Sequence, residues 1–520
     1  MKRKFTYRVK DKIIEKEINH IPLRYILSIL LSAIEVVLTI GIVVVLCIYV
    51  KWFYVAVGIT QLVCIVTIVA SEDNPDYKIP WLVIIFTLPV AGFMLYFMFY
   101  SRKLKKKYIS KMKSLNSLTC KKDDSKLFEA LKASDPVAHN QAKMLCNLCD
   151  SHLFTNTSQR YFSSGEELFE SMLADLKTAE KFIYMEYFII EEGELWNSIL
   201  DALKEKVKAG VEVKVLYDDI GCMSTLEGNY AKKLSRLGIE CEIFSKLKVQ
   251  ADSEFNNRSH RKITVIDGKI GYTGGVNIAD EYINKVERHG HWKDGGIRIE
   301  GEAVWELADL FLVDFGINAK GGWKSENELF PTADVSADGY LVPFGDGPRP
   351  IYNRGVAKIA IMNLLNSATK FVYITTPYLI LDNELCQAIE NTALRGVDVK
   401  IITPHIPDKR FIFSMTRSSY HRFIEAGVTI YEYAPGFIHA KTYVADGEYA
   451  IVGTVNLDYR SLVHHFENGI WMYKCDCIKD IVADINQTLE KSTKITPEMA
   501  KPSFLHRAFR SLIKIFTPLM

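Results

Sequence analysis

The chain has 520 residues, a formal net charge of +2 and 48% hydrophobic side chains. This length suits two or three domains, and the balanced charge excludes the broad basic surface expected of a general nucleic-acid binder. Ten cysteines are scattered, and the close pairs, Cys146 with Cys149 and Cys475 with Cys477, have no matching second pair at zinc-site spacing. We therefore expect reduced thiols in a cytosolic domain and no metal ion.

Three apolar stretches follow a basic N-terminus, over residues 25–50, 52–70 and 79–100. Each is close to the ~20 residues that a helix needs to cross a bilayer. A cleavable signal peptide is not expected, because the first apolar stretch starts late and runs too long. Residues 1–101 are thus predicted to hold membrane-anchoring helices, and this density of apolar residues argues against buried helices of a soluble protein.

Charged residues indicate how these stretches cross the membrane. Seven Lys and Arg and no acid lie between Arg102 and Lys113, which predicts a cytoplasmic location for the chain that follows. Residues 71–78 are acidic and suit the far side, so 52–70 and 79–100 are predicted to form a hairpin. A third span over 25–50 would put the basic N-terminus outside, against the same rule. We predict at least two spans, and leave 25–50 open between a span, a re-entrant segment and an interfacial helix.

Residues 102–160 are predicted to be a polar, helical linker, whose lysines either bind anionic headgroups or only fix the membrane orientation. The first lobe, 161–335, opens with a helix at Ser164, followed by a strand over 182–190, a helix over 195–209 and a strand over 211–217. This alternation predicts an α/β lobe with helices on both faces of a sheet.

The second lobe, 336–490, repeats this order with a helix over 357–369, a strand over 371–376, a helix over 383–395 and a strand over 397–403. A fold unit is therefore duplicated. Residues 316–350, rich in Gly, Pro and acids, are predicted to connect the lobes. The tail, 491–520, is basic and amphipathic, and its residues 504–520 either lie on a membrane surface or dock onto the body.

One motif occurs in both lobes, with the pattern H-x-K-x4-D-x6-G-x2-N. Its members are His260, Lys262, Asp267 and Asn277 in the first copy, and His439, Lys441, Asp446 and Asn456 in the second. Residues i and i+2 share one face of a strand, so each His and Lys should project together. Each Asp starts an Asp-Gly turn, and the returning strand brings the Asn back towards its own His and Lys.

Two such clusters that face each other suit a phosphodiester. The ammonium groups neutralise its oxygens, and the carboxamides add directed donors. A neutral imidazole, with an ordinary pKa of about 6.5, can attack phosphorus or transfer a proton. One His can attack in line while the other protonates the leaving oxygen. Neither a cofactor nor a metal is expected, because His and Lys supply the positive charge.

The duplicated motif resembles the HKD signature of the phospholipase D superfamily. Further segments resemble bacterial cardiolipin synthases, namely residues 216–221, 375–378, 395–400, 453–461 and Phe466-Glu467. The resemblance covers roughly residues 50–520. It implies two pseudo-twofold-related α/β/α sandwich lobes of the phospholipase D type, preceded by an α-helical membrane domain.

The resemblance also implies an acid that orients each attacking or proton-transferring imidazole. By position, Asp294 is expected beside His260 and Glu467 beside His439. The two motifs are symmetric, so the residues do not decide which His is modified. Precedent in the family favours His260 as the nucleophile and His439 as the general acid and base. No role is assigned to the flanking histidines, which are His289, His291, His464 and His465.

The remaining motif residues carry two interpretations each. Asn277 and Asn456 are expected to contact the substrate phosphate together with the two lysines, and the same side chains suit helix N-caps. Asp267 and Asp446 are included in the catalytic set, although residues at a hairpin turn more often shape the turn or bond to backbone.

The resemblance therefore implies a cardiolipin synthase, in which phosphatidylglycerol is both donor and acceptor and a phosphohistidine is the intermediate. The expected location is the cell membrane, as a multi-pass protein on an anionic bilayer with a cytoplasmic catalytic domain and no nucleic-acid partner. The alternatives are another phospholipase D-type phospholipid synthase or a hydrolytic phospholipase D. A membrane-anchored nuclease would need a basic groove, and a catalytically dead scaffold would not need intact His and Lys in both copies.

Overall fold

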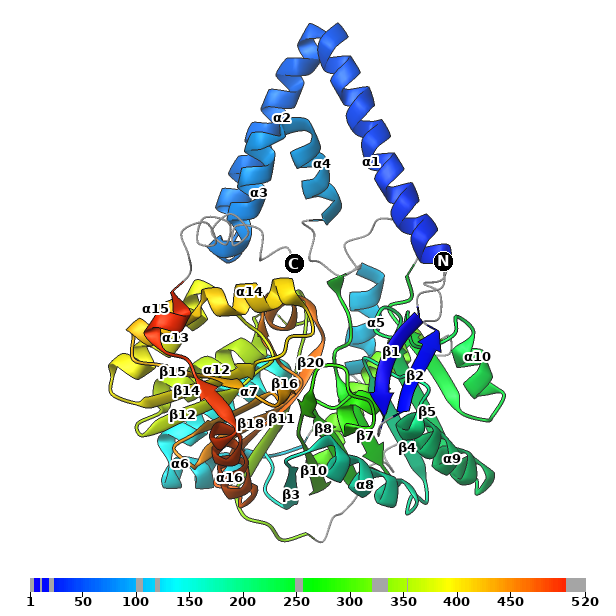
Figure 1. The fold of residues 1–520 in the computed structure, drawn as a ribbon, viewed down its shortest axis with the longest axis vertical. Coiled ribbons are helices and arrows are strands. Elements are labelled where there is room, and N and C mark those ends of the chain that lie inside the picture. Colours follow the sequence, from blue (N-terminus) through cyan, green and yellow to red (C-terminus); the bar gives the residue numbers. More distant parts are fainter. Residues whose placement is uncertain are drawn as a thin grey trace. The chain divides into compact units, whose positions relative to one another are not determined.

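Figure 1 shows the computed structural model, which describes residues 4–9, 12–17, 23–99, 106–116, 122–247, 256–319, 335–352 and 354–501. By their contacts, His20–Lys103 belong to one unit, and Leu104–Lys246 with Arg258–Lys501 belong to another. Residues 504–520, predicted as an amphipathic tail helix, lie outside the described part of the chain.

The first unit is helical, with elements α1 (Leu23–Tyr49), α2 (Lys51–Ala70), α3 (Pro75–Thr87) and α4 (Pro89–Phe99). Within the described residues, Trp52–Ala70 is the helix long and apolar enough to cross a membrane, with a mean hydropathy of 2.3. Many large apolar side chains of α1 and α2 are exposed, including Val37, Ile48 and Tyr54. Such a surface is stable in contact with lipid tails and unfavourable in water.

The prediction of one continuous span over residues 79–100 is wrong. The helix stops before Pro89, and α4 folds back onto α3. Gly92 lies at this contact, where an added Cβ would be 2.7 Å from the Ile84 carbonyl oxygen. The 13 residues of α3 extend about 20 Å, which is short of the ~30 Å of a hydrocarbon core.

The second unit contains two mixed β-sheets. The first sheet has the spatial order β3 (Thr157–Phe162), β10 (Gly296–Gly301), β8 (Ile270–Gly274), β7 (Lys262–Ile266), β4 (Phe182–Tyr187), β5 (Glu212–Asp218) and β6 (Glu240–Phe244). Strands β4, β5 and β6 are parallel, whereas β7, β8, β10 and β3 continue the sheet in antiparallel pairs.

The second sheet repeats this order strand by strand. It runs β11 (Tyr340–Asp346), β20 (Glu467–Tyr473), β18 (Tyr449–Gly453), β17 (Thr442–Ala445), β12 (Phe371–Thr375), β14 (Asp398–Pro404), β15 (Thr429–Tyr433) and the additional β21 (Ser492–Lys494). The predicted duplication of a fold unit is therefore confirmed at the level of sheet topology.

Helices cover both faces of each sheet, and Figure 1 shows these layers. In the first lobe they are α8 (Gly165–Leu176) and α9 (Glu194–Lys208) on one face and α11 (Val304–Asn318) on the other. In the second lobe they are α12 (Val356–Ser367), α13 (Asn383–Leu394) and α16 (Cys477–Glu490). The predicted α/β/α sandwich is confirmed.

Strand β4 shows why a strand in this position is apolar along its whole length. Its Ile183 and Met185 pack beneath α8 and α9, while Tyr184 points to the opposite face and stacks on Phe311 of α11 at 5.0 Å between ring centroids. Alternate side chains thus enter two different cores. The core on the α11 side continues into the second lobe, so the two lobes share one apolar interior.

The remaining elements are short or flank the sheets. They are β1 (Lys4–Val9), β2 (Lys12–Glu17), α5 (Lys106–Asn116), α6 (Ser125–Ser134), α7 (Pro136–Cys149), α10 (Tyr230–Ser235), η2 (Asp280–Ile283), β9 (His291–Lys293), β13 (Leu379–Ile380), α14 (Arg410–Ser418), α15 (Tyr420–Glu425), β16 (Gly436–Ile438), β19 (Leu457–Asp458), η4 (Arg460–His464) and α17 (Pro497–Ala500). The predicted connector over 316–350 needs correction, because it contains the end of α11 and all of β11.

The two motif aspartates lie in the turns at the far ends of β7 and β17. Asp267 and Asp446 adopt positive φ, as an Asp-Gly hairpin turn requires. The Asp267 carboxylate accepts backbone N–H bonds from residues 180, 181 and 182 at 2.7–2.8 Å. Asp446 binds the backbone of residues 369, 370 and 371 in the same way. Each aspartate therefore fixes the start of the neighbouring strand.

We predict that Asp446→Ala lowers the free energy of unfolding by about 1–3 kcal/mol, because charge-assisted hydrogen bonds to three backbone amides are lost. The turnover number of the folded fraction should change less than about twofold, since the carboxylate binds backbone at the far end of the strand. Urea unfolding and turnover are measured on the same preparation. Asp201→Ala, at an exposed surface position, is the control. A large loss of turnover with unchanged stability would return Asp446 to the catalytic set.

Candidate active site

Each motif histidine lies just before the strand that carries its lysine, and the backbone of the opposite lobe holds it there. The His260 N–H donates to the Phe466 carbonyl at 2.8 Å, and the His439 N–H donates to the Lys293 carbonyl at 2.7 Å. Strand β16, which leads to His439, pairs in parallel with β9 of the first lobe. The two motifs are thus bound to each other across the lobe boundary.

The acids are exchanged between the lobes. His260 Nδ1 lies 3.0 Å from Glu467 Oε2, and His439 Nδ1 lies 2.7 Å from Asp294 Oδ2. The expected pairing of Asp294 with His260 and of Glu467 with His439 is therefore wrong. Sequence order suggested partners within one lobe, but β9 pairs with β16, which leads to His439, and Phe466 forms a parallel bridge with Ser259 next to His260. Asp294 packs closely on Gly275, where an added Cβ would lie 2.0 Å from Oδ1.

Burial sets the protonation state of these four side chains. It lowers the pKa of His260 to about 3, which the charge of Glu467 only partly opposes. Burial and the Lys441 ammonium lower the pKa of His439 to about 4. Burial also works against ionisation of both acids, but the facing imidazoles and their hydrogen bonds hold the pKa of Glu467 and of Asp294 below the usual range. Each neutral imidazole then donates Nδ1–H to a carboxylate and keeps a lone pair on Nε2.

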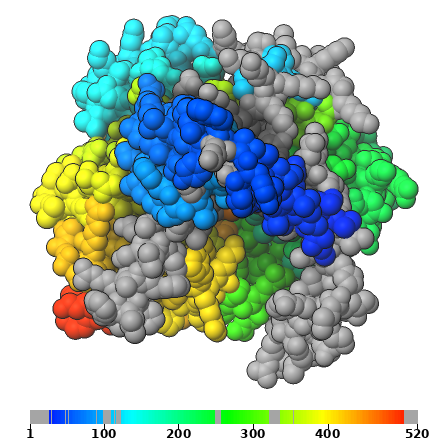
Figure 2. All heavy atoms as spheres, turned by 90° about the horizontal axis from the view of Figure 1, so that it is seen from above, coloured from blue at the N-terminus to red at the C-terminus, as the bar shows by residue number. Residues whose placement is uncertain are grey.

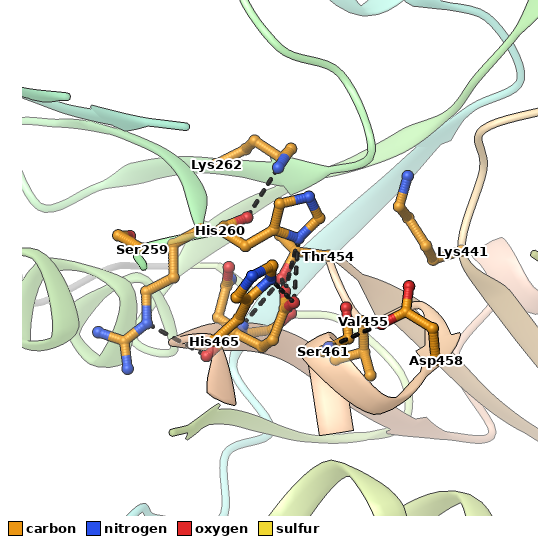
Figure 3. A network of polar contacts seen from close by, with 12 residues as sticks. Ser259, His260, Lys262, Lys441, Thr454, Val455, Asp458, Ser461 and His465 are labelled. Carbon is orange, nitrogen blue, oxygen red and sulfur yellow. Dashed lines mark hydrogen bonds and ion pairs between the residues drawn. The ribbon is translucent and has the colours of Figure 1, made fainter. Parts of the chain in front are cut away.

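The two lysines belong to the same site. Lys262 Nζ donates to the His260 carbonyl at 2.7 Å, and Lys441 Nζ donates to the His439 carbonyl. Burial, followed by repulsion from Lys441, lowers the pKa of Lys262 to about 7, and burial lowers the pKa of Lys441 to about 8. Figure 3 shows the two lysine side chains and the His260 ring, with the lysines coming from different lobes.

The two motif asparagines differ in their contacts. Asn277 has both of its polar groups engaged by protein, since Oδ1 accepts the Ile189 N–H at 3.1 Å and Nδ2 donates to the Tyr282 hydroxyl at 2.7 Å. These two bonds position Asn277 within the protein, and its contact with the substrate phosphate stays a prediction. Asn456 is also buried, and its Oδ1 has no hydrogen-bond partner in the described part of the chain. The motif aspartates, Asp267 and Asp446, lie in the hairpin turns at the far ends of β7 and β17.

Two buried arginines, Arg258 and Arg261, support the first half-site, and no sequence pattern indicated their role. Arg258 forms bonds of 2.9–3.0 Å with Asp218, whose carboxylate also accepts the Ser259 N–H. Arg261 pairs with Asp314 of α11 at 2.8 Å and donates to the Glu467 carbonyl. These bonds fix the backbone on both sides of His260. Asp218 lies in residues 216–221, one of the segments that resemble cardiolipin synthases. This resemblance is the sequence feature that could have pointed to Asp218.

The two half-sites differ in the residue that stands two positions before each acid. Trp292 precedes Asp294 and packs on the His439 ring at 5.4 Å between centroids. His465 precedes Glu467 and lies 5.4 Å from the His260 ring. The sequence did not single out His465, because four histidines flank the two acids and nothing in their spacing ranks them.

The α/β/α fold occurs twice, and each copy contributes one His and one Lys to a shared site. This combination defines the phospholipase D class of phosphoryl-transfer proteins. A family described as "Cardiolipin synthase, PLD-like domain" matches residues 172–288 and 361–491, and one described as "Phospholipase_D-nuclease N-terminal" matches residues 59–99. The crystal structure of a phosphatidylserine synthase from Haemophilus influenzae has the same fold, with a TM-score of 0.55 at 16% identity over 73% of this chain and 98% of that one.

Proteins of closer sequence identify the family. The chain is 32% identical over 464 residues to a cardiolipin synthase of Alkalihalophilus pseudofirmus, covering 86% of this chain and 90% of the relative. It is 33% identical over 466 residues to one from a Geobacillus species, covering 88% and 92%. An uncharacterized protein of Streptococcus mutans is 39% identical over 468 residues, covering 87% and 98%. The chain belongs to the cardiolipin synthase family and is a phosphatidyltransferase of the phospholipase D superfamily.

The lowered lysine pKa values predict how the activity depends on pH. An ammonium is charged only below its pKa, so charge that attracts phosphate is lost as pH rises through about 7 for Lys262 and about 8 for Lys441. The value of kcat/KM should fall over this range. In the double variant Lys262→Arg with Lys441→Arg the fall should move above about pH 9, because guanidinium groups stay charged.

The measurement is a pH profile of kcat/KM at subsaturating lipid for the wild type and the double variant. Lys293→Arg is the matched control, because Lys293 is buried nearby but pairs with Asp484 at 2.8 Å. An alkaline fall at the same pH in the double variant would assign it to a different group.

Proposed function

We propose that this chain makes cardiolipin from two molecules of phosphatidylglycerol, through a phosphohistidine on His260. The observation that carries the proposal is the exchanged pair of His–acid contacts, which presents two neutral imidazoles of opposite lobes beside two lysines in one buried site. Two imidazoles of this kind suit a double displacement at phosphorus. The resemblance of the chain to cardiolipin synthases supports the choice of lipid.

In the first step, the Nε2 lone pair of His260 attacks phosphorus and the bond to the glycerol oxygen breaks. His439 gives that oxygen a proton, so that glycerol leaves as a neutral alcohol. The negative charge of the phosphodiester raises the pKa of His439, which lets the imidazole carry this proton. Glu467 balances the positive charge that develops on His260, and Lys262 and Lys441 balance the charge on the non-bridging oxygens.

In the second step, His439 takes the proton from the headgroup hydroxyl of a second phosphatidylglycerol. The alkoxide oxygen attacks phosphorus, the bond to His260 breaks, and the imidazole returns to its neutral form. Asp294 stabilises the imidazolium of His439 in both steps. A water molecule in place of the second lipid would give phosphatidic acid, so exclusion of water from the site decides between transfer and hydrolysis.

We also propose that α1 and α2 cross the membrane as a hairpin, and that α3 and α4 form a re-entrant pair. Two crossings put the basic N-terminus and the basic residues 102–113 on the same, cytoplasmic side, which agrees with the positive-inside rule. A cysteine introduced at Val50, between α1 and α2, should react with a membrane-impermeant thiol reagent added outside intact cells. Protection of that cysteine would contradict this topology.

We predict the products that purified full-length protein forms in vesicles of phosphatidylglycerol. Cardiolipin and glycerol should appear in equal amounts, as measured by mass spectrometry, and His260→Ala should lower the rate by about 10⁴-fold or more. Phosphatidic acid as the main product would indicate a hydrolase, and a new headgroup on the lipid only after another alcohol is added would indicate a different synthase.

A substrate with a good leaving group separates the two steps. We predict that the p-nitrophenyl ester of phosphatidic acid gives a burst of p-nitrophenol with Asp294→Asn, because a phenolate leaves without protonation by His439. Later turnover should be about 10²–10⁴-fold slower, since the acceptor alcohol still needs a base. Glu467→Gln should lose the burst itself, because Glu467 orients His260.

Rapid-mixing absorbance measures the burst, and mass spectrometry of peptides from the quenched Asp294→Asn protein locates the phosphatidyl group. The two acid variants serve as controls for each other, since each removes one buried charge from the same site. A burst kept in Glu467→Gln and lost in Asp294→Asn would make His439 the nucleophile.

A further inference from the structure

His260, His465 and Glu467 form a cluster with the composition of a transition-metal site. One potential ligand atom from each of them lies within 4.8 Å of the other two, and all three residues are buried. Within this cluster, Nδ1 of His260 is 3.0 Å and Nδ1 of His465 is 3.7 Å from the Glu467 carboxylate. Ligand atoms around a tetrahedral zinc ion are about 3.3 Å apart, given bonds of about 2.0–2.1 Å to His and carboxylate. To reach that spacing, atoms that now lie up to 4.8 Å apart would move closer together by rotation of their side chains.

Several polar atoms of this cluster have no hydrogen-bond partner among the described residues. They are Nδ1 and Nε2 of His465 and Oε1 of Glu467. His465 is 8% exposed, and a buried imidazole with both nitrogens unsatisfied is unusual, because buried polar groups are normally paired. Its ring lies beside the His260 ring, with 5.4 Å between the ring centroids, as Figure 3 shows. The two ring nitrogens of His465 are therefore available as ligands next to the His260–Glu467 pair.

The second half-site is a built-in comparison. Trp292 occupies the position that His465 occupies in the first half-site, and it offers no metal ligand. In Asp294, the oxygen that does not contact His439 is Oδ1, and it accepts the Gly295 N–H at 2.9 Å. The His–acid contact is common to both half-sites, and the ligand-bearing side chain next to it is present only in the first.

We propose that His260, His465 and Glu467 bind a divalent transition-metal ion such as Zn²⁺, and that the bound ion reversibly inhibits the enzyme. Two imidazoles and one carboxylate are a common zinc ligand set, with a fourth position left for water. Binding through either nitrogen of His260 stops the proposed attack. At Nε2 the ion takes the attacking lone pair, and at Nδ1 it replaces the proton that Glu467 holds.

The charges around the cluster set the expected strength. Glu467 and the two imidazoles favour a cation, whereas the buried ammonium groups of Lys262 and Lys441 oppose it. Because these attractive and repulsive charges partly cancel, we expect a micromolar dissociation constant for Zn²⁺, which is much weaker binding than at a structural zinc site. We also expect competition with an anionic phosphate, which binds the same lysines and the same histidine.

The test uses full-length protein without a polyhistidine tag, in detergent, after removal of metal with a chelator. Titration with Co²⁺ should give the visible absorption of a four-coordinate ion, saturating at one equivalent. His465→Asn should abolish that absorption. His289→Asn should keep it, because His289 packs against Trp292 beside the other half-site. If His465→Asn does not fold, as judged by circular dichroism, Glu467→Gln replaces it in the titration.

Inhibition is measured separately, by adding Zn²⁺ to the phosphatidylglycerol assay. The midpoint should rise at least tenfold in whatever activity His465→Asn retains, and should be unchanged in His289→Asn. Absence of the Co²⁺ absorption in the wild type, or its persistence in His465→Asn, would overturn the metal site. The spectral titration needs no lipid, so its result is independent of whether the proposed cardiolipin synthesis is correct.

Discussion

The exchange of acids across the lobe boundary is the contact on which the rest of the site depends. Each histidine receives its carboxylate and one backbone hydrogen bond from the opposite lobe, so neither half-site is complete within its own lobe. The shared apolar interior beneath α11 keeps the lobes at a fixed distance. A rigid interface is needed because hydrogen bonds of 2.7–3.0 Å tolerate little movement. The geometry of the site therefore depends directly on how the two lobes pack against each other.

Burial gives this interface its chemical character. In water an imidazole and an ammonium would carry their ordinary charges, but here burial lowers the pKa of both histidines and both lysines. The carboxylates stay ionised because each faces an imidazole that donates to it. The site thus holds two neutral imidazoles beside two ionised carboxylates.

The pseudo-twofold symmetry is close in topology and broken at the site. Sheet order repeats strand by strand, yet the residue beside the His439 ring is Trp292 and the residue beside the His260 ring is His465. A duplicated fold can keep its architecture with different side chains of suitable volume at such a position. The chemistry of that side chain is free to differ, and this difference gives the two histidines unequal surroundings.

The sequence alone determined the repeated α/β units, the two His–Lys pairs and the apolar N-terminus, because periodicity, turn residues and a duplicated motif are local properties of the chain. Local patterns also placed Asp267 and Asp446 at turns. The partners of the histidines, the engagement of Asn277, the buried Arg258–Asp218 contact and the break between α3 and α4 were decided by tertiary structure. Each of these depends on which segments pack together across long sequence separations, and no spacing within one lobe encodes a contact supplied by the other.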